Sequence, residues 1–152
     1  MWPFTRKKWE TLGRSMSAEE LRGLLMAGTP FLFSAPLYCH LKDTDLRALP
    51  AAEFELLVFD CWFPHDEPAY KSEIWDCDDF AVAFMAAVRT RWAKVSRGKE
   101  ALAFGYVSGL VEGMGNHAFI WAVDDKGVVN FYEPQTGKRV NYVLKSVVLV
   151  ET

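Results

Sequence analysis

The sequence predicts a single α+β domain in which helices come first and an antiparallel sheet follows. Two patterns predict this order: residues up to about 96 carry helical periodicity, and residues from 101 onward alternate like strands. Size is the third observation, because 152 residues form one domain with a sufficient core without disulfides or metal staples. About half of the residues are apolar, which excludes a disordered or fibrous chain.

The first predicted helix follows Ser17. Ser17 is a good N-cap residue, and Glu20 stands three positions later, where it completes a capping box. Leucines then fall on one helical face, which indicates that this face is buried: Leu21, Leu24 and Leu25. Residues 31–37 are aromatic, apolar and bounded by prolines, so they form either a short strand or buried coil. A second helix is predicted over residues 50–59, because Pro50 suits a first turn.

The central helix of the predicted fold begins at Cys77. Asp76 is a good N-cap residue, and Asp79 stands where its carboxylate reaches the free amides of the first turn. Every residue from Phe80 to Val88 is apolar, so we expect this helix to be buried on most sides. A thiol at the first helical position faces unpaired N–H groups and the positive end of the helix dipole, which favour the thiolate.

Strand patterns fill the rest of the chain. Residues 101–111 alternate in the manner of a strand, and residues 117–123 and 128–132 flank the hairpin signal Asp124-Asp125-Lys126-Gly127. A last strand is predicted over residues 142–150. We therefore expect N-terminal helices and the central helix to pack on a C-terminal antiparallel sheet.

Charge and cysteine content exclude several classes of protein. The net charge is −3, so neither nucleic-acid binding nor general attraction to an anionic membrane is expected. The three cysteines form no C-x-x-C pair, which argues against a disulfide framework or a thiolate zinc site and indicates a reducing compartment. No apolar run is long enough to span a bilayer.

The N-terminal residues 1–14 combine aromatic side chains with a basic cluster. They lack the apolar segment and cleavage site of a secretory signal, so we expect a cytoplasmic protein. Within the single domain 1–152, these residues form either a loosely ordered arm or a helix docked on the body, and a membrane or partner contact is the alternative. The oligomeric state is left open.

Three residues of the predicted fold can act together. Pairing about the hairpin turn places His117 almost opposite Glu133 and Pro134, within one residue of register. If the central helix packs its N-terminus against that end of the sheet, Cys77, His117 and Glu133 form a nucleophile, a general base and an orienting acid. This chain order is that of papain-like and transglutaminase-like folds. Taken alone, a cysteine at the head of an apolar helix, such as Cys77, is usually a small buried hydrophobe.

Carboxylates crowd the thiol and indicate a cation site. Asp78 and Asp79 follow Cys77 directly, while Glu73 and the side-chain carbonyl of Gln135 are further hard oxygen ligands of the kind that calcium prefers. A bound calcium, or another divalent cation such as manganese, would offset the negative charge that opposes the thiolate. The alternative is that Asp78 and Asp79 are solvated first-turn residues that stabilise the helix dipole.

Three motifs, in this order, resemble a known family. Residues Glu73 to Ala81, Gly115 to Phe119 and Phe131 to Thr136 are similar to the papain-like C-terminal domain of the Marasmius oreades agglutinin and of related phage and bacterial proteins. The resemblance covers roughly residues 70–136. It implies a calcium-dependent papain-like cysteine peptidase, a hydrolase acting on a peptide or protein substrate.

Residue by residue, the resemblance implies Cys77 as nucleophile, His117 as general base and Glu133 as orienting residue. Trp75 is close enough to the thiol to line a substrate groove. The metal ligands would be Asp78, Asp79 and Gln135. No β-trefoil lectin repeats are present, so the resemblance does not imply sugar binding.

Two alternative functions follow from the same residues. Papain-like enzymes use a glutamine upstream of the cysteine, and residues 70–73 contain none. The first alternative, which the missing glutamine permits, is a catalytically inactive phage structural or host-interaction protein that retains the fold and the metal site. The other alternative is a cell-wall amide hydrolase, as other small Cys-His hydrolases are.

Overall fold

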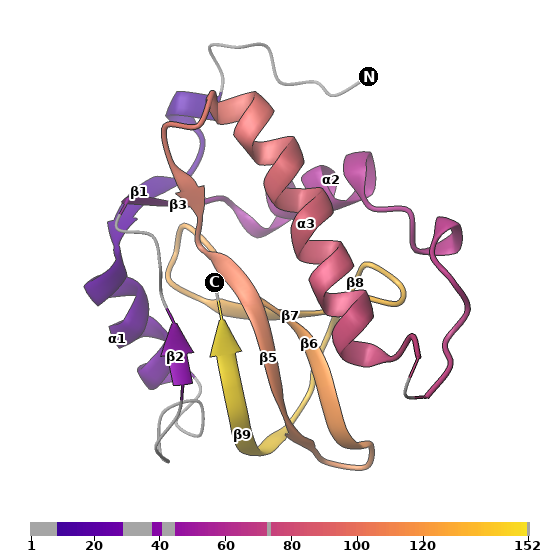
Figure 1. Ribbon diagram of the computed structural model, residues 1–152. Helices are drawn as coiled ribbons and strands as arrows, with labels where there is room; N and C mark the ends of the chain where they lie inside the picture. The colour runs from indigo at the N-terminus through magenta and orange to yellow at the C-terminus, as the bar shows by residue number, and fades with distance from the viewer. Residues whose placement is uncertain (1–8, 29–37, 41–44, 73, 152) are drawn as a thin grey trace.

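The computed structural model describes residues 9–28, 38–40, 45–72 and 74–151 and has an α+β architecture (Figure 1). Its α-helices are α1 (Ala18–Gly28), α2 (Ala51–Cys61) and α3 (Cys77–Ser96), and its 3-10 turns are η1 (Trp9–Thr11) and η3 (Pro64–Asp66). Its strands are β1 (Arg14–Ser17), β2 (Tyr38–His40), β3 (Asp45–Ala48), β4 (Ala101–Leu102), β5 (Phe104–Val111), β6 (Gly115–Val123), β7 (Val129–Glu133), β8 (Lys138–Val140) and β9 (Leu144–Glu151). The strand or coil expected over residues 31–37 lies outside the described residues.

The main sheet has six strands in the order β2-β9-β5-β6-β7-β8. Its C-terminal strands pair antiparallel, as predicted, but β2 joins the edge parallel to β9. A second sheet of three strands, β1-β3-β4, was not predicted. Strands of two to four residues are too short to show an alternating pattern, and this is why the sequence did not reveal them.

Strand β6 forms the middle layer of the molecule. Its residues Ala118, Ile120 and Ala122 face a core shared with α2 and α3. The alternate residues Phe119, Trp121 and Val123 face a second core that includes leucines of α1. The sequence of a strand that is covered on both faces is a continuous apolar run, and this is the case for β6 from Ala118 onward.

The hairpin between β6 and β7 forms at the predicted turn. The paired register runs from Val123–Val129 to Ile120–Tyr132. The Asp124 side chain closes the turn by accepting the backbone N–H groups of Lys126 and Val128 at 3.0 and 2.9 Å. Gly127 adopts a φ of 80°, a left-handed conformation that glycine reaches without strain.

Helix α3 lies across one face of the sheet (Figure 1) and buries one side of its surface. Phe80, Phe84 and Val88 are buried on that side. Val82 is 55% exposed and Ala86, one turn later, is also exposed, whereas the other residues of the apolar run are buried or half-buried, as expected. One face of the helix packs, and the other remains in contact with solvent although its residues are apolar.

The N-terminal end of the described chain is anchored rather than loose. Trp9 is buried, and its ring meets the ring of Trp92 edge-on at a centroid distance of 5.9 Å. Among the described residues, no helix is long and apolar enough to cross a membrane.

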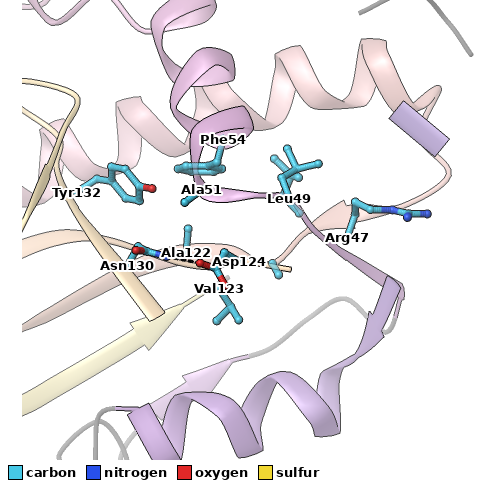
Figure 2. A pocket seen from close by; sticks show the side chains of 11 residues that line it. Arg47, Leu49, Ala51, Phe54, Ala122, Val123, Asp124, Asn130 and Tyr132 are labelled. Carbon is cyan, nitrogen blue, oxygen red and sulfur yellow. Dashed lines mark hydrogen bonds between the residues drawn. The ribbon is translucent and has the colours of Figure 1, made fainter. Parts of the chain in front are cut away.

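A small internal pocket lies between α2 and the sheet (Figure 2). Phe54 and Tyr132 line it, with ring centroids 5.1 Å apart, and Asn130 donates a hydrogen bond to Asp124 at 3.3 Å. Its volume is about 10 Å³, which is the space of about one water molecule. This pocket is therefore a packing gap and is too small for a ligand.

The packing of α3 generates a stability prediction. Phe84 is fully buried and contacts the Trp62 ring at a centroid distance of 5.4 Å, so Phe84→Ala should lower the free energy of unfolding by about 3–5 kcal/mol. Val82→Ala, on the exposed side of the same helix, is the control and should change it by less than about 0.5 kcal/mol. Urea denaturation followed by circular dichroism measures both, and equal losses would contradict the packing described.

Candidate functional site

The thiol of Cys77 stands at the N-terminus of α3, as predicted. Asp76 and Asp79 form a capping box, in which the Asp76 N–H donates to Asp79 Oδ2 at 3.2 Å. The half-buried Cys77 Sγ accepts the backbone N–H of Ala118 in β6 at 3.4 Å. A hydrogen bond from a backbone amide stabilises a thiolate more than a thiol. The helix and the sheet therefore meet at the sulfur atom.

His117 and Glu133 contact each other beside the thiol. His117 lies near the start of β6 and Glu133 ends β7, and they are only 7% and 8% exposed. His117 Nε2 is 2.7 Å from Glu133 Oε2. The backbone pairing ends at Ile120–Tyr132, so side chains beyond the paired ladder make this contact. With Nε2 engaged by Glu133, Nδ1 is the ring nitrogen left to face Cys77.

Three further groups hold the Glu133 carboxylate. The Tyr142 hydroxyl donates to Oε2 at 2.6 Å, and the Gln135 backbone N–H donates to Oε1 at 3.0 Å. Burial alone would raise the pKa of Glu133, but its hydrogen bonds with His117, Tyr142 and Gln135 lower it. The Trp62 indole fixes the following turn by donating to the Pro134 carbonyl at 2.8 Å.

Tyr142 and Trp62 are residues that the sequence reasoning missed. Tyr142 was placed only at the beginning of the last strand, and nothing near Trp62 suggested a role in the site. Both contacts join segments far apart in the chain, so no local pattern signals them. A hydroxyl group among apolar residues just before a strand was the one sign that Tyr142 has a polar partner.

The neighbours of His117 set its protonation. Burial lowers the pKa of His117, but its hydrogen bonds with Cys77 and Glu133 and the charges of these two groups outweigh burial and raise the pKa to about 9. Phe119 stacks beside the ring, with a centroid distance of 6.0 Å, and Tyr142 meets it edge-on at 5.6 Å. The imidazole is therefore held in place and charged at neutral pH.

Carboxylates gather beside the thiol in a way that suits a hard cation. Ligand atoms of Asp76, Cys77 and Asp78 lie within 4.8 Å of one another. A hydrogen bond with the Asp76 carboxylate raises the pKa of Asp78, with further contributions from burial and from the charges of Asp76 and Asp79.

The other predicted metal ligands have different positions. The Asp79 carboxylate is engaged in the helix cap. Gln135 lies in the turn after β7, where its backbone N–H binds Glu133. Glu73 lies outside the described residues. The described oxygen donors that come together beside the thiol are therefore those of Asp76 and Asp78.

Trp75 lies just before the thiol helix. Its carbonyl accepts the Lys71 N–H at 2.7 Å, and its ring meets Phe80 edge-on at a centroid distance of 5.9 Å. Its indole N–H is buried and has no hydrogen-bond partner among the described residues. Trp75 thus packs on the core at the margin of the site, with one unused donor.

A family model described as "Agglutinin C-terminal" matches residues 64–139, which is half of the chain. The chain belongs to the agglutinin C-terminal family. The matched segment contains the Cys77 end of α3, the whole of β5, β6 and β7, and the Glu133 turn. The family resemblance carried by the three motifs is therefore confirmed.

Two solved structures are similar to this agglutinin-family chain. One is PSL1a in complex with E64, with 27% identity and a TM-score of 0.68 over 91% of this chain and 51% of that one. The other is the Polyporus squamosus lectin bound to the human-type influenza-binding epitope Neu5Acα2-6Galβ1-4GlcNAc, with 26% identity and a TM-score of 0.70 over 91% of this chain and 49% of that one. The chain thus spans about half the length of these proteins. A search of curated proteins gave no match.

These findings correct the function predicted from the sequence. The family is that of agglutinins, and its solved neighbours include a lectin rather than papain-like peptidases. The prediction of a calcium-dependent cysteine peptidase is therefore wrong, as are the alternatives of a cell-wall amide hydrolase and an inactive phage structural protein. The prediction transferred an activity from three motifs, whereas the likeness to the two solved structures extends over 91% of the chain.

The pKa of His117 generates a prediction for stability against pH. The pKa is raised from 6.5 to about 9 in the folded protein, so the stability it contributes is complete below about pH 6.5 and is lost as pH rises through about 9. The free energy of unfolding should fall by at most about 3 kcal/mol over this range. Urea unfolding at a series of pH values measures it.

The control for this experiment is His117→Asn, which removes the titrating ring. The slope between pH 6.5 and 9 should then flatten. Equal slopes for the native chain and the variant would contradict the raised pKa.

Proposed function

We propose that this agglutinin-family chain acts through a reactive thiol at Cys77, which captures electrophilic ligands. One observation carries the proposal: the sulfur atom accepts the Ala118 N–H and stands beside His117, which Glu133 holds at 2.7 Å. A charged imidazole and a backbone donor both favour the thiolate, the form that reacts. The finer fold expectation, a papain-like arrangement of helix thiol and strand histidine, belongs to this proposal and rests on the same contacts.

The ligand class follows from the chemistry of the thiolate and from one neighbour. PSL1a forms a complex with E64, and an epoxide is the class of electrophile that we propose for the Cys77 thiolate. In the proposed step the Cys77 thiolate attacks an epoxide carbon, a carbon–sulfur bond forms and the ring carbon–oxygen bond breaks. The alkoxide that results takes the proton from the His117 imidazolium. Glu133 stabilises the imidazolium before the step and fixes the orientation of the ring.

We also propose that the carboxylates beside the thiol hold a divalent cation, with calcium as the first choice. The Asp76 and Asp78 oxygens are hard ligands that lie close together, and the crowding that raises the pKa of Asp78 supports a counter-ion there. Asp79, Gln135 and Glu73 stay candidates for further ligands. When bound, the cation would neutralise the acidic cluster, so that Cys77 would face less negative charge.

Carbohydrate binding is a second candidate function. The specific observation in its favour is that the Polyporus squamosus lectin, which is similar over 91% of this chain, is bound to a sialylated trisaccharide. About half of that lectin has no counterpart here, so a glycan site in this chain would have to be built by its own residues. This candidate replaces the peptide or protein substrate expected from the sequence.

The reactive thiol predicts selective alkylation. In a Cys39→Ser background, E64 at pH 7.5 should modify Cys77 and spare Cys61, because burial and the neighbouring Asp60 raise the pKa of Cys61 to about 11. His117→Asn should slow the reaction about a hundredfold, and Cys77→Ala should abolish it. Mass spectrometry of peptide digests measures the rates. Tyr142→Phe should slow it less than His117→Asn, because the hydroxyl that it removes binds Glu133, while the ring that contacts His117 is kept. Similar rates at Cys61 and Cys77 would overturn the proposal.

The cation site predicts a calcium-dependent melting temperature. Calcium at a hundredfold excess over its dissociation constant should raise the Tm by on the order of 5 °C. Asp78→Asn should remove most of this shift, whereas Asp66→Asn, an exposed carboxylate outside the cluster, should keep it. Differential scanning fluorimetry with calcium and with chelator makes the comparison. Identical curves in the two conditions would exclude the site.

Carbohydrate binding predicts a measurable affinity for the epitope recorded with the lectin. Isothermal titration of the chain with Neu5Acα2-6Galβ1-4GlcNAc should show saturable heat. Cys77→Ala should bind equally well, because the glycan needs no nucleophile. No saturation at millimolar glycan would contradict this candidate and leave the alkylation result untouched.

A further inference from the structure

We propose that the groove between α2 and the turn preceding β8 binds an acidic saccharide, an inference that rests on the carbohydrate-binding candidate. The groove has a volume of about 800 Å³, within the range of small-ligand sites. Its walls are the last turns of α2, residues 63–65 and residues 136–139, which end the turn after β7 and begin β8. It is separate from the small pocket of Figure 2 and from the sulfur of Cys77.

Aromatic rings form the apolar part of the groove. Phe59 is 83% exposed and Phe63 is 47% exposed, which is unusual for two large rings that line one concave surface. Such rings present flat apolar faces on which the C–H face of a sugar ring can lie. They are also stiff, so that holding a ligand restricts little side-chain freedom.

The floor of the groove is rigid. Trp62 is buried there, its indole N–H donates to the Pro134 carbonyl at 2.8 Å, and its ring packs on Phe84. The backbone of Gly137 approaches this ring so closely that an added Cβ would lie 3.2 Å from it. Gly137 also has a φ of 69°, so a side chain at this position would be strained. The groove is therefore preformed, and a ligand would not have to organise it.

Charged groups at the rim favour an anionic ligand. Arg139 binds Glu55 through Nε at 2.7 Å and also through Nη2, which cancels the one carboxylate that lines the groove. Lys138 makes no ion pair within the described part of the chain. A positive charge thus remains beside the exposed rings, and the planar guanidinium keeps donors for hydroxyl or carboxylate groups. A sugar acid matches both the rings and the charge.

The groove is joined to the thiol site by one turn. The backbone N–H groups of Thr136 and Gly137 donate to the Glu133 carbonyl at 3.2 and 2.7 Å. The same turn therefore forms the groove wall and carries the carboxylate that orients His117. A ligand bound in the groove would contact the same turn that positions Glu133.

The test is a titration of the ¹⁵N-labelled full chain with two glycans, followed by residue-resolved NMR. The sialylated trisaccharide Neu5Acα2-6Galβ1-4GlcNAc is the acidic probe, and Galβ1-4GlcNAc is its neutral counterpart. We expect the acidic glycan to shift the amides of residues 136–139 and to bind more tightly than the neutral one. Phe59→Ala should weaken binding about tenfold with an unchanged Tm, because the ring is exposed.

Two further variants complete the design. Lys138→Glu should reduce the preference for the acidic glycan, since it reverses the charge at the rim. Tyr70→Ala, which removes a ring that is 55% exposed and outside the groove, is the matched control and should bind as the native chain does.

Each other outcome overturns the proposal in a distinguishable way. If Phe59→Ala and Lys138→Glu leave glycan binding unchanged, the glycan binds outside the groove. The groove proposal is then wrong, and the carbohydrate-binding candidate is retained. If neither glycan binds, both the groove proposal and the carbohydrate-binding candidate are overturned. Sedimentation velocity decides the remaining case: a dimer that Phe59→Ala dissociates, without glycan binding, would assign the groove to a second copy of the chain.

Discussion

The contact between His117 and Glu133 is the interaction on which the remainder of the site depends. A carboxylate and an imidazole that are both more than nine-tenths buried must satisfy each other and every remaining lone pair, because an unpaired charge at this depth is strongly destabilising. The fold meets this demand with the Tyr142 hydroxyl and the Gln135 amide. The consequence is a charged ring in one orientation, and the sulfur of Cys77 is placed beside it by a different element. The proposed reactivity of the thiol would thus be a by-product of satisfying a buried ion pair.

The layers of the fold explain how these groups keep their positions. Helix α3 brings the thiol to the sheet, and the Ala118 amide of β6 meets it there. The turn after β7 is fastened from outside by the Trp62 indole, which links α2 to the backbone next to Glu133. Trp62 also forms the floor of the groove, so one buried aromatic residue serves both the thiol site and the proposed glycan site. The two sites are neighbours because they share this support.

The sequence predicted the elements whose signals are local. The cap formed by Asp76 and Asp79 located the start of α3 within one residue, and the Asp124 to Gly127 turn located the hairpin. Both depend on side chains that bind backbone a few residues away. Strands β1, β3 and β2 were missed because they are short and are stabilised by partners far along the chain. Tyr142 was missed for the same reason. The peptidase prediction failed differently: the three motifs indicated a reactive constellation, but an activity depends on the surfaces around it.

The two-sided burial of β6 limits how this protein can vary. The strand carries His117 and Ala118 and lies between two cores, so a shift along its axis would disturb both at once. Motions that open only the site are therefore suppressed, and the residues around the thiol can separate only when much of the domain does. Changes in ligand preference would accordingly arise at exposed side chains of the periphery, such as Phe59 and Lys138, which project from the packed layers. The thiol site is thus held in place by two cores, whereas the exposed border of the groove is free to vary.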